Sequence, residues 1–247
     1  MFVQLTNKYI TMESNNNCQQ PCCCPSNEEM FLMFKNAAEL HNENLLYIAT
    51  LQNYLDLSFP KAFQASEDFS KNAYPTINVA SIITEEDAQF YFDKIVDSSV
   101  DDNWVEFADF LKDQGLLTNT QWQFYKQIIN TILAKQDENP RLIVSSMIGL
   151  QNSLLSRSDL NSNQLPGMYA LSNGAVAILQ FWANALEDPN NPWNKAAVGG
   201  NLPNWLKKGL RDLGGFVVGA VAGTLIGGPV VGAAGGTLVG GACSGSR

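Results

Sequence analysis

The feature that most constrains the fold of this chain is a glycine-rich stretch without charge near its C-terminus. From Leu213 to Cys243, 31 residues pass without a charged side chain. Eleven of the 28 residues from 214 to 241 are glycine. Most of them stand four residues apart in two runs: Gly215, Gly219, Gly223 and Gly227, then Gly228, Gly232, Gly236 and Gly240. Residues four apart share one face of an α-helix, so each run predicts a helix with one bare face.

This spacing predicts close packing of one helix on another. Each glycine inside a helix weakens it by roughly 0.5–1 kcal/mol relative to alanine. Eight such positions therefore need a compensating interaction, and backbone-to-backbone packing along the bare faces supplies one. A lipid bilayer also favours the helix, because backbone groups there must satisfy their own hydrogen bonds. We interpret the eight glycines as a helix-packing zipper that makes contact with membrane lipid.

The two runs are separated by a turn signal, Gly227-Gly228-Pro229. Glycine can end one helix, and proline fits the first turn of the next. We therefore predict a helical hairpin with arms of about 14 residues, or ~21 Å each. Arms of this length are shorter than the ~30 Å hydrocarbon core. They could enter the bilayer without crossing it, thin it, or form one kinked span.

Immediately before the glycine runs lies a short segment that combines an aromatic residue with basic residues. It contains Trp205, Lys207, Lys208 and Arg211. Tryptophan beside lysine and arginine is typical of a segment at the membrane–water interface. We predict that these four residues form a membrane-interface anchor.

Residues 203–247 resemble the glycine-zipper bacteriocin-like proteins, the group that includes the microcin V type. The resemblance implies an exported, membrane-active antibacterial polypeptide. In such precursors a short leader ends at a double glycine, which Gly199-Gly200 could mimic. Here about 200 residues precede that position, so whether it is a cleavage site is left open.

The remainder of the chain carries the signals of an all-α protein. Apolar residues recur at three-and-four spacing behind capping residues, beginning at Ser26, so we expect a helical domain over residues 28–186. Residues 57–83 lose this period and are expected to be a long connection with one short helix. Residues 187–204 contain three prolines and are expected to be a linker. The predicted fold is an irregular multi-helix bundle followed by the glycine-zipper hairpin, residues 205–247.

Composition excludes some classes of protein. A hydrophobic fraction of 45% is enough for a core, so global disorder is excluded. The net charge is −9, of which residues 201–247 contribute +3 (four basic residues against one acidic residue) and the rest −12. Such an acidic body argues against nucleic acid as a partner. It also indicates that the body and the C-terminal segment have different surroundings.

The N-terminal segment, residues 1–27, is polar and rich in Asn and Gln, and we expect it to be a disordered tail. It lacks the apolar run of a conventional signal peptide, so the location of the protein, secreted or membrane-associated, is left open. The tail carries four of the five cysteines: Cys18, Cys22, Cys23 and Cys24. They have no structural role, or they are acylated or bind metal. No cofactor or defined metal site is predicted.

Nothing in the sequence indicates an enzyme. His41 is the only histidine, and it falls on an apolar helix stripe, where a buried or boundary residue is expected. The chain lacks the Gly-x-Ser-x-Gly motif of a nucleophilic serine and the glycine motifs that cradle nucleotides.

Two functional hypotheses follow. The first is a membrane-active, toxin-like protein whose body carries or shields a hairpin that inserts and self-associates through its glycines. The second is a non-enzymatic interaction module that is anchored or oligomerised through the zipper, with a protein partner for the helical body. A structural alternative is that the hairpin packs inside the protein's own body.

Overall fold

The computed structural model of the 247-residue protein describes residues 25–100, 103–198 and 203–246. Over these residues the regular structure is helical throughout, with no strand. One isolated bridge joins Leu57 to Ser246 and holds the C-terminal end against the connection after the first described helix. The predicted all-α class is confirmed.

The helices follow one another with short connections. The α-helices are α2 (Asn27–Ile48), α3 (Phe59–Ala73), α4 (Glu85–Val100), α5 (Trp104–Asp113), α6 (Asn119–Ala134), α7 (Pro140–Leu155), α8 (Leu165–Glu187), α9 (Asn194–Ala197), α10 (Asn204–Gly227) and α11 (Pro229–Gly245). Two 3₁₀ turns, η1 (Tyr54–Asp56) and η2 (Val79–Ser81), lie in the connections that flank α3.

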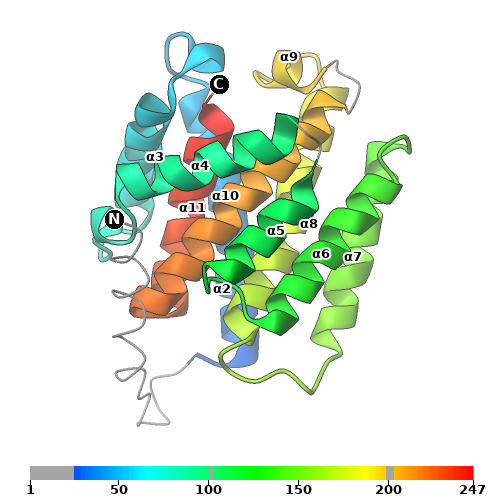
Figure 1. The fold of residues 1–247 in the computed structure, drawn as a ribbon. Coiled ribbons are helices and arrows are strands. Elements are labelled where there is room, and N and C mark those ends of the chain that lie inside the picture. Colours follow the sequence, from blue (N-terminus) through cyan, green and yellow to red (C-terminus); the bar gives the residue numbers. More distant parts are fainter. Residues whose placement is uncertain (1–24, 101–102, 199–202, 247) are drawn as a thin grey trace.

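The two C-terminal helices occupy the middle of the bundle. Figure 1 shows α10 and α11, in orange and red, running through its centre with other helices around them. Helix α11 contacts α2 and α3, whereas α10 contacts α8 and α4. Helices α5, α6 and α7 lie on the side of the molecule away from α3 (Figure 1). There α7 packs on α8, and α6 contacts α5. The helices expected to be a separate hairpin therefore supply the centre of the core.

Several helix ends follow from local sequence signals. Ser26 caps α2: its hydroxyl accepts a hydrogen bond from the backbone N–H of Glu29, whose carboxylate accepts one from the N–H of Ser26. Thr118 and Gln121 form the same reciprocal arrangement at the start of α6. Pro140 lies in the first turn of α7, where the missing N–H costs nothing.

The structure differs from the sequence-based expectation in two connections. Helix α3 fills most of the region expected to be a long connection, because Pro60 lies in its first turn rather than interrupting it. The expected linker contains α9 and a fully buried Trp193, whose Nε1 donates to the carbonyl oxygen of Leu45 at 3.0 Å. The N-terminal cysteines and the Gly199-Gly200 pair lie outside the described residues.

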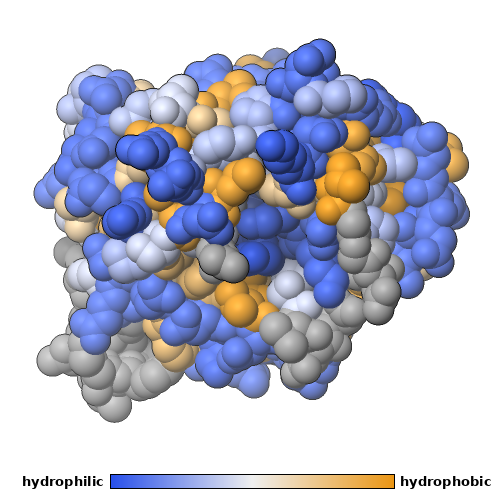
Figure 2. Space-filling model, turned by 90° about the horizontal axis from the view of Figure 1, so that it is seen from above, coloured by the Kyte–Doolittle hydropathy of each residue, from blue (hydrophilic) through white to orange (hydrophobic). Residues whose placement is uncertain are grey.

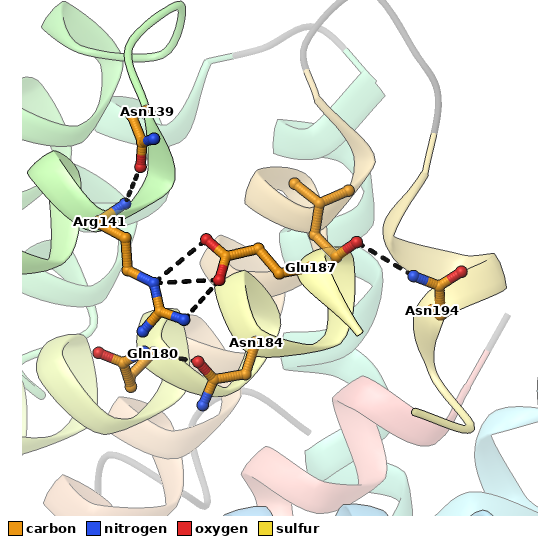
Figure 3. A network of polar contacts seen from close by, with 7 residues as sticks. Asn139, Arg141, Gln180, Asn184, Glu187 and Asn194 are labelled. Atoms are coloured by element: carbon orange, nitrogen blue, oxygen red, sulfur yellow. Dashed lines mark hydrogen bonds and ion pairs between the residues drawn. The ribbon is translucent and has the colours of Figure 1, made fainter. Parts of the chain in front are cut away.

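A surface network connects α7 and α9 to the end of α8 (Figure 3). The guanidinium of Arg141, in the first turn of α7, donates from Nε to both carboxylate oxygens of Glu187 at 3.1 Å. Asn194 of α9 donates to the carbonyl oxygens of Ala185 and Leu186 at 2.8 and 3.1 Å. These contacts hold α7 and α9 against the end of α8. Seen from above, the surface is mostly hydrophilic with separate small apolar patches (Figure 2).

Candidate functional site

The turn between α10 and α11 is a single residue, Gly228. Its φ of 82° lies in the left-handed region that side chains disfavour, so glycine is required there. The N–H of Gly228 donates to the carbonyl oxygen of Thr224 at 2.9 Å, and Pro229 begins α11. Such a short turn makes the two helices antiparallel neighbours.

The face of α10 toward α11 consists of glycines four residues apart. A methyl group placed on Gly219 would overlap the carbonyl oxygen of Gly235, and one placed on Gly235 would overlap the carbonyl oxygen of Gly219. One turn away, a methyl group on Gly215 would lie 2.9 Å from the carbonyl oxygen of Val239. One turn the other way, Gly223 lies in the same manner against Val231. At Gly219 and Gly223 the nearest atoms belong to the backbone of α11, whereas the side chain of Cys243 also lies against Gly215.

The predicted glycines of α11 lie on more than one face. A methyl group on Gly232 would lie 2.6 Å from the carbonyl oxygen of Ala220 in α10. One on Gly236 would lie 3.0 Å from the ring of Phe216, and one on Gly240 would lie 2.5 Å from Cδ2 of His41 in α2. The glycines of α11 therefore admit both the neighbouring backbone and bulky rings from α10 and α2.

Other members of the predicted set belong to the turn, and two important glycines were not in it. Next to the turn, the atoms nearest to a methyl group on Gly227 belong to Val231 of the following helix, and Gly228 has open space around it. Gly235 makes the closest backbone contact with α10, and Gly241 gives room to the amide of Asn44. The doublet Gly235-Gly236 leaves the register of α11 ambiguous in the sequence, whereas the register of α10 is clear.

Further glycines let the body approach the hairpin from the other side. A methyl group on Gly174 of α8 would lie 2.9 Å from the ring of Phe216. One on Gly214 would lie 3.1 Å from the ring of Phe107 in α5 and 3.2 Å from Ile95 in α4. As a result Phe216 is fully buried. The sides of the hairpin are thus covered by helices of the body.

The four predicted anchor residues lie in the first turns of α10, at the end of the hairpin opposite the turn at Gly228, which we call its base. Most of them are covered by protein. Trp205 is buried, and Lys207 and Lys208 are partly exposed. The guanidinium of Arg211 lies 5.2 Å from the ring centre of Phe92, a cation–π contact. Burial and, to a smaller extent, the positive charge of Arg211 lower the pKa of the Lys208 ammonium to about 8, although Asp212 opposes the shift. In this structure these side chains point into the body as well as toward solvent.

Asp212 is a buried carboxyl group in the middle of this base. It is fully inaccessible, and its Oδ2 accepts a hydrogen bond from Nε1 of Trp182 in α8. Burial raises the pKa of Asp212 to about 7, although hydrogen bonds from Ser244 and Trp182 and the positive charges of Lys208 and Arg211 oppose the shift. A raised pKa favours the neutral, protonated form of the carboxyl group, which reduces the cost of burying it. Sequence analysis missed this residue, since a single Asp next to basic residues resembles a solvated ion pair.

The side of α11 toward α2 and α3 is unexpectedly polar, and we call it the polar seam. Nδ2 of Asn44 donates to the carbonyl oxygen of Thr237 at 3.2 Å. The hydroxyl of Thr237 donates to the carbonyl oxygen of Ala37 at 3.1 Å and lies 3.2 Å from the hydroxyl of Tyr74. Oδ1 of Asn44 and the hydroxyls of Ser66 and Ser70 are buried without a hydrogen-bond partner. Unpaired buried polar atoms of this kind weaken an interface.

His41 is part of the polar seam. It is fully buried, with Nε2 3.4 Å from the hydroxyl of Ser244 in α11 and Nδ1 3.1 Å from Oδ1 of Asn42. Its ring meets that of Phe216 edge to face at 6.0 Å. Burial lowers the pKa of His41 to about 4, so the ring is neutral at ordinary pH. The expectation that His41 is a core or boundary residue is confirmed by its burial.

Helix hydropathy, potential metal ligands and similarity to known proteins do not identify a function for this arrangement. Helix α10 is the one described helix long and apolar enough to cross a membrane, although 78% of its most apolar window is buried here, as in the core helix of a soluble protein. No group of three potential metal ligands occurs among the described residues. No protein-family model matches the chain, and no curated protein or solved structure is significantly similar to it.

Proposed function

We propose that the protein is membrane-active and toxin-like, and that its body holds the α10–α11 hairpin until the hairpin enters a bilayer. The observation that carries the proposal is that a charge-free helical pair lies at the centre of the bundle. The 31 residues from Leu213 to Cys243 lack charge, and α2, α3, α4 and α8 contact them or their immediate neighbours. Apolar surface covered in this way is protected from water but is available to acyl chains once it is uncovered.

The internal packing of the hairpin supports movement as one unit. The closest contacts of Gly219 and Gly235 join the backbones of α10 and α11, and the side chain of Ile82 from the body lies beside Gly235. They would therefore be retained in a bilayer, where close glycine packing is a common way to join helices. Only the outer contacts, such as Phe216 against α8, would exchange protein neighbours for lipid. The backbone hydrogen bonds within each helix need no water in either state.

The distribution of charge gives the proposed insertion a direction. The uncharged part of α10, residues 213–227, is 15 residues long, or about 22 Å. It ends at Asp212 and Arg211, which would stay at the aqueous side because charged groups are costly inside a bilayer. The one-residue turn at Gly228 would then enter first. An uncharged arm of about 22 Å is shorter than the ~30 Å core, so a thinned bilayer or a partial entry is expected.

A reversible covalent lock tests this proposal. A methyl group on Gly245 of α11 would lie 3.4 Å from Cβ of Ala62 in α3, close to the Cβ separation of a disulfide. We would introduce A62C and G245C together into a full-length protein whose native cysteines are replaced (C18S, C22S, C23S, C24S and C243A). Oxidation ties α11 to the body, and a reducing agent releases it.

The readout is release of a trapped dye from lipid vesicles. We expect no release by the oxidised protein and full release after reduction, with A62C and G245C alone as controls that do not respond to oxidation. Equal release by the locked and unlocked forms would refute insertion of the hairpin. A protein with its cysteines replaced that releases no dye from vesicles of any composition would refute membrane activity.

A second candidate is supported by α7. Between Arg141 and Arg157 this edge helix has no charged residue, yet Leu142, Ile148 and Leu155 are 53%, 42% and 48% exposed. An uncharged edge helix with exposed apolar residues suits a protein partner. The alternative is thus a non-enzymatic interaction module. Sedimentation velocity over a range of concentrations tests self-association through α7. The L142D, L155D change should abolish that self-association.

A further inference from the structure

The turn end of the hairpin is the part of α10 and α11 that the body leaves uncovered. Leu225 is 37% exposed and Val230 is 45% exposed, and Ile226 and Val231 are partly exposed. By contrast, residues 213–223 of α10 and 232–245 of α11 are all buried. Figure 1 shows the turn at the opposite end of the hairpin from α9 and the C-terminus. Exposed branched side chains beside a tight turn form an apolar tip.

A second segment without charge lies against this tip. Residues 72–84, between α3 and α4, contain no Asp, Glu, Lys, Arg or His. Their Val79 and Ile82 are buried against Ala234 of α11, with Ile77 and Val231 packed beside them. We call the tip, residues 224–231, together with residues 74–82, the uncharged end. It joins two segments that are about 150 positions apart in the sequence.

We propose that the uncharged end is a docking surface for a zwitterionic lipid bilayer. This inference rests on the proposed function in naming a bilayer as the partner. It differs from that proposal because docking uses side chains that are already exposed and needs no opening of the body. Docking would place the turn at Gly228 against the lipid before any insertion.

The size of the surface favours lipid over a second copy of the chain. Its two most exposed apolar side chains, Leu225 and Val230, are each less than half exposed. Together with their neighbours they could bury on the order of a few hundred Å², whereas stable protein interfaces bury about 1,200–2,000 Å². A bilayer needs no complementary shape, so a small apolar tip is sufficient for partition into its interface.

The surrounding charge favours zwitterionic over anionic lipid. Residues 72–84 are followed directly by the acidic first turn of α4, with Glu85, Glu86 and Asp87. On the other side Lys71 is paired with Glu67 at 3.2 Å. An uncharged surface with an acidic rim, on a protein of net charge −9, is repelled by anionic headgroups and is compatible with the exposed choline group of phosphatidylcholine.

The experiment measures binding of the full-length protein to vesicles of phosphatidylcholine by flotation. We expect L225D with V230D to lower the partition coefficient at least tenfold. The matched control is L46D with L55D, in α2 and η1, whose side chains are 46% and 38% exposed, and it should leave binding unchanged. At low salt we also expect weaker binding to vesicles in which about a third of the lipid is phosphatidylglycerol than to vesicles of phosphatidylcholine alone.

The oxidised A62C, G245C protein separates this inference from the proposed function. Binding of the locked protein without dye release supports docking, even if the unlocked protein also fails to release dye and the proposed function is thereby wrong. Equal binding by the L225D, V230D protein and the L46D, L55D control would overturn the docking surface. So would tighter binding to the anionic vesicles, or a dimer in sedimentation velocity that the L225D, V230D change removes.

Discussion

The two sides of α11 are packed in different ways. Toward α10, backbone meets backbone at Gly235 and Gly219, and no polar side chain intervenes. Toward α2 and α3, the same helix meets Asn44, His41 and unpaired serine hydroxyls. One side therefore has the close apolar packing of a permanent contact. The other contains buried polar groups that would be better solvated by water.

This difference indicates where the bundle would separate. Unpaired buried polar atoms each cost about 1–3 kcal/mol, and exposure to water would remove that cost. The glycine contact, by contrast, gains nothing from water. If the body opens, the polar seam is the weak boundary, and α10 and α11 should stay together.

The largest expected effect comes from filling the glycine contact. Gly219→Ala places a methyl group on the carbonyl oxygen of Gly235, and neither backbone can move away without separating the helices. We expect a loss of about 3 kcal/mol or more in the free energy of unfolding, or failure to fold. Urea denaturation of the full-length protein followed by circular dichroism measures it.

A matched substitution elsewhere should have the opposite sign. Gly149 also lies within a helix, α7, but a methyl group there would meet no atom within 4 Å. Gly149→Ala should therefore stabilise the protein by about 0.5–1 kcal/mol through helix propensity alone. Similar destabilisation by both changes would show that the close backbone contact at Gly219 is not the cause of the loss.

The next effect concerns pH and the polar seam. His41 has a folded pKa near 4 against an ordinary value of 6.5, so the unfolded chain binds its proton first as the pH falls. His41 therefore lowers stability between pH 6.5 and 4, by up to about 3 kcal/mol. Asp212 has a raised folded pKa, so the folded protein holds this proton more tightly than the unfolded chain does. Asp212 therefore lowers stability as the pH rises from 3.8 toward 7.

The two residues should hence mask each other between about pH 4 and 6.5. Asp212→Asn leaves His41 alone, and we expect that variant to lose stability on acidification. His41→Asn leaves Asp212 alone, and we expect that variant to lose stability as the pH rises over the same range. Denaturation midpoints measured from pH 4 to 7 provide the test. Parallel pH profiles for the two variants would contradict the assigned protonation states.

The smallest effects distinguish paired from unpaired hydroxyls in the polar seam. Thr237→Val removes the hydrogen bond to the carbonyl oxygen of Ala37 and should cost about 1 kcal/mol. Ser70→Ala removes a buried hydroxyl without a partner and should be neutral or stabilising by up to about 1 kcal/mol. A loss from Ser70→Ala as large as that from Thr237→Val would show that the seam is better satisfied than its geometry indicates. Thermal unfolding of both variants supplies the comparison.

The fold class and several helix starts could be predicted because they depend on local signals. Ser26 and Thr118 cap their helices through neighbours three residues away, and Pro140 acts within one turn. The length of helix α3 was underestimated because Pro60 looks the same in sequence whether it interrupts a helix or begins one. Trp193 sits in a Pro- and Asn-rich stretch, and only its distant partner Leu45 explains its burial.

The candidate site was less predictable, because spacing shows that a face is bare but not what covers it. The run from Gly215 to Gly223 does face another helix, and the doublet at 235–236 concealed the register of α11. Trp205 and Arg211 have the composition of an interface anchor, yet Trp205 is buried and Arg211 lies over Phe92. The polar seam could not be predicted, because Asn44 and Ser66 are ordinary residues on helices distant in sequence.

Amide hydrogen exchange of the full-length protein, with and without phosphatidylcholine vesicles, tests the central claim that α10 and α11 leave the body as one unit. We predict that vesicles increase exchange in α2 and α3, where the polar seam opens, while amides of α10 and α11 from Leu213 to Cys243 remain protected. Exchange that rises together in α10, α11, α2 and α3, or that does not change in any of them, would contradict the account.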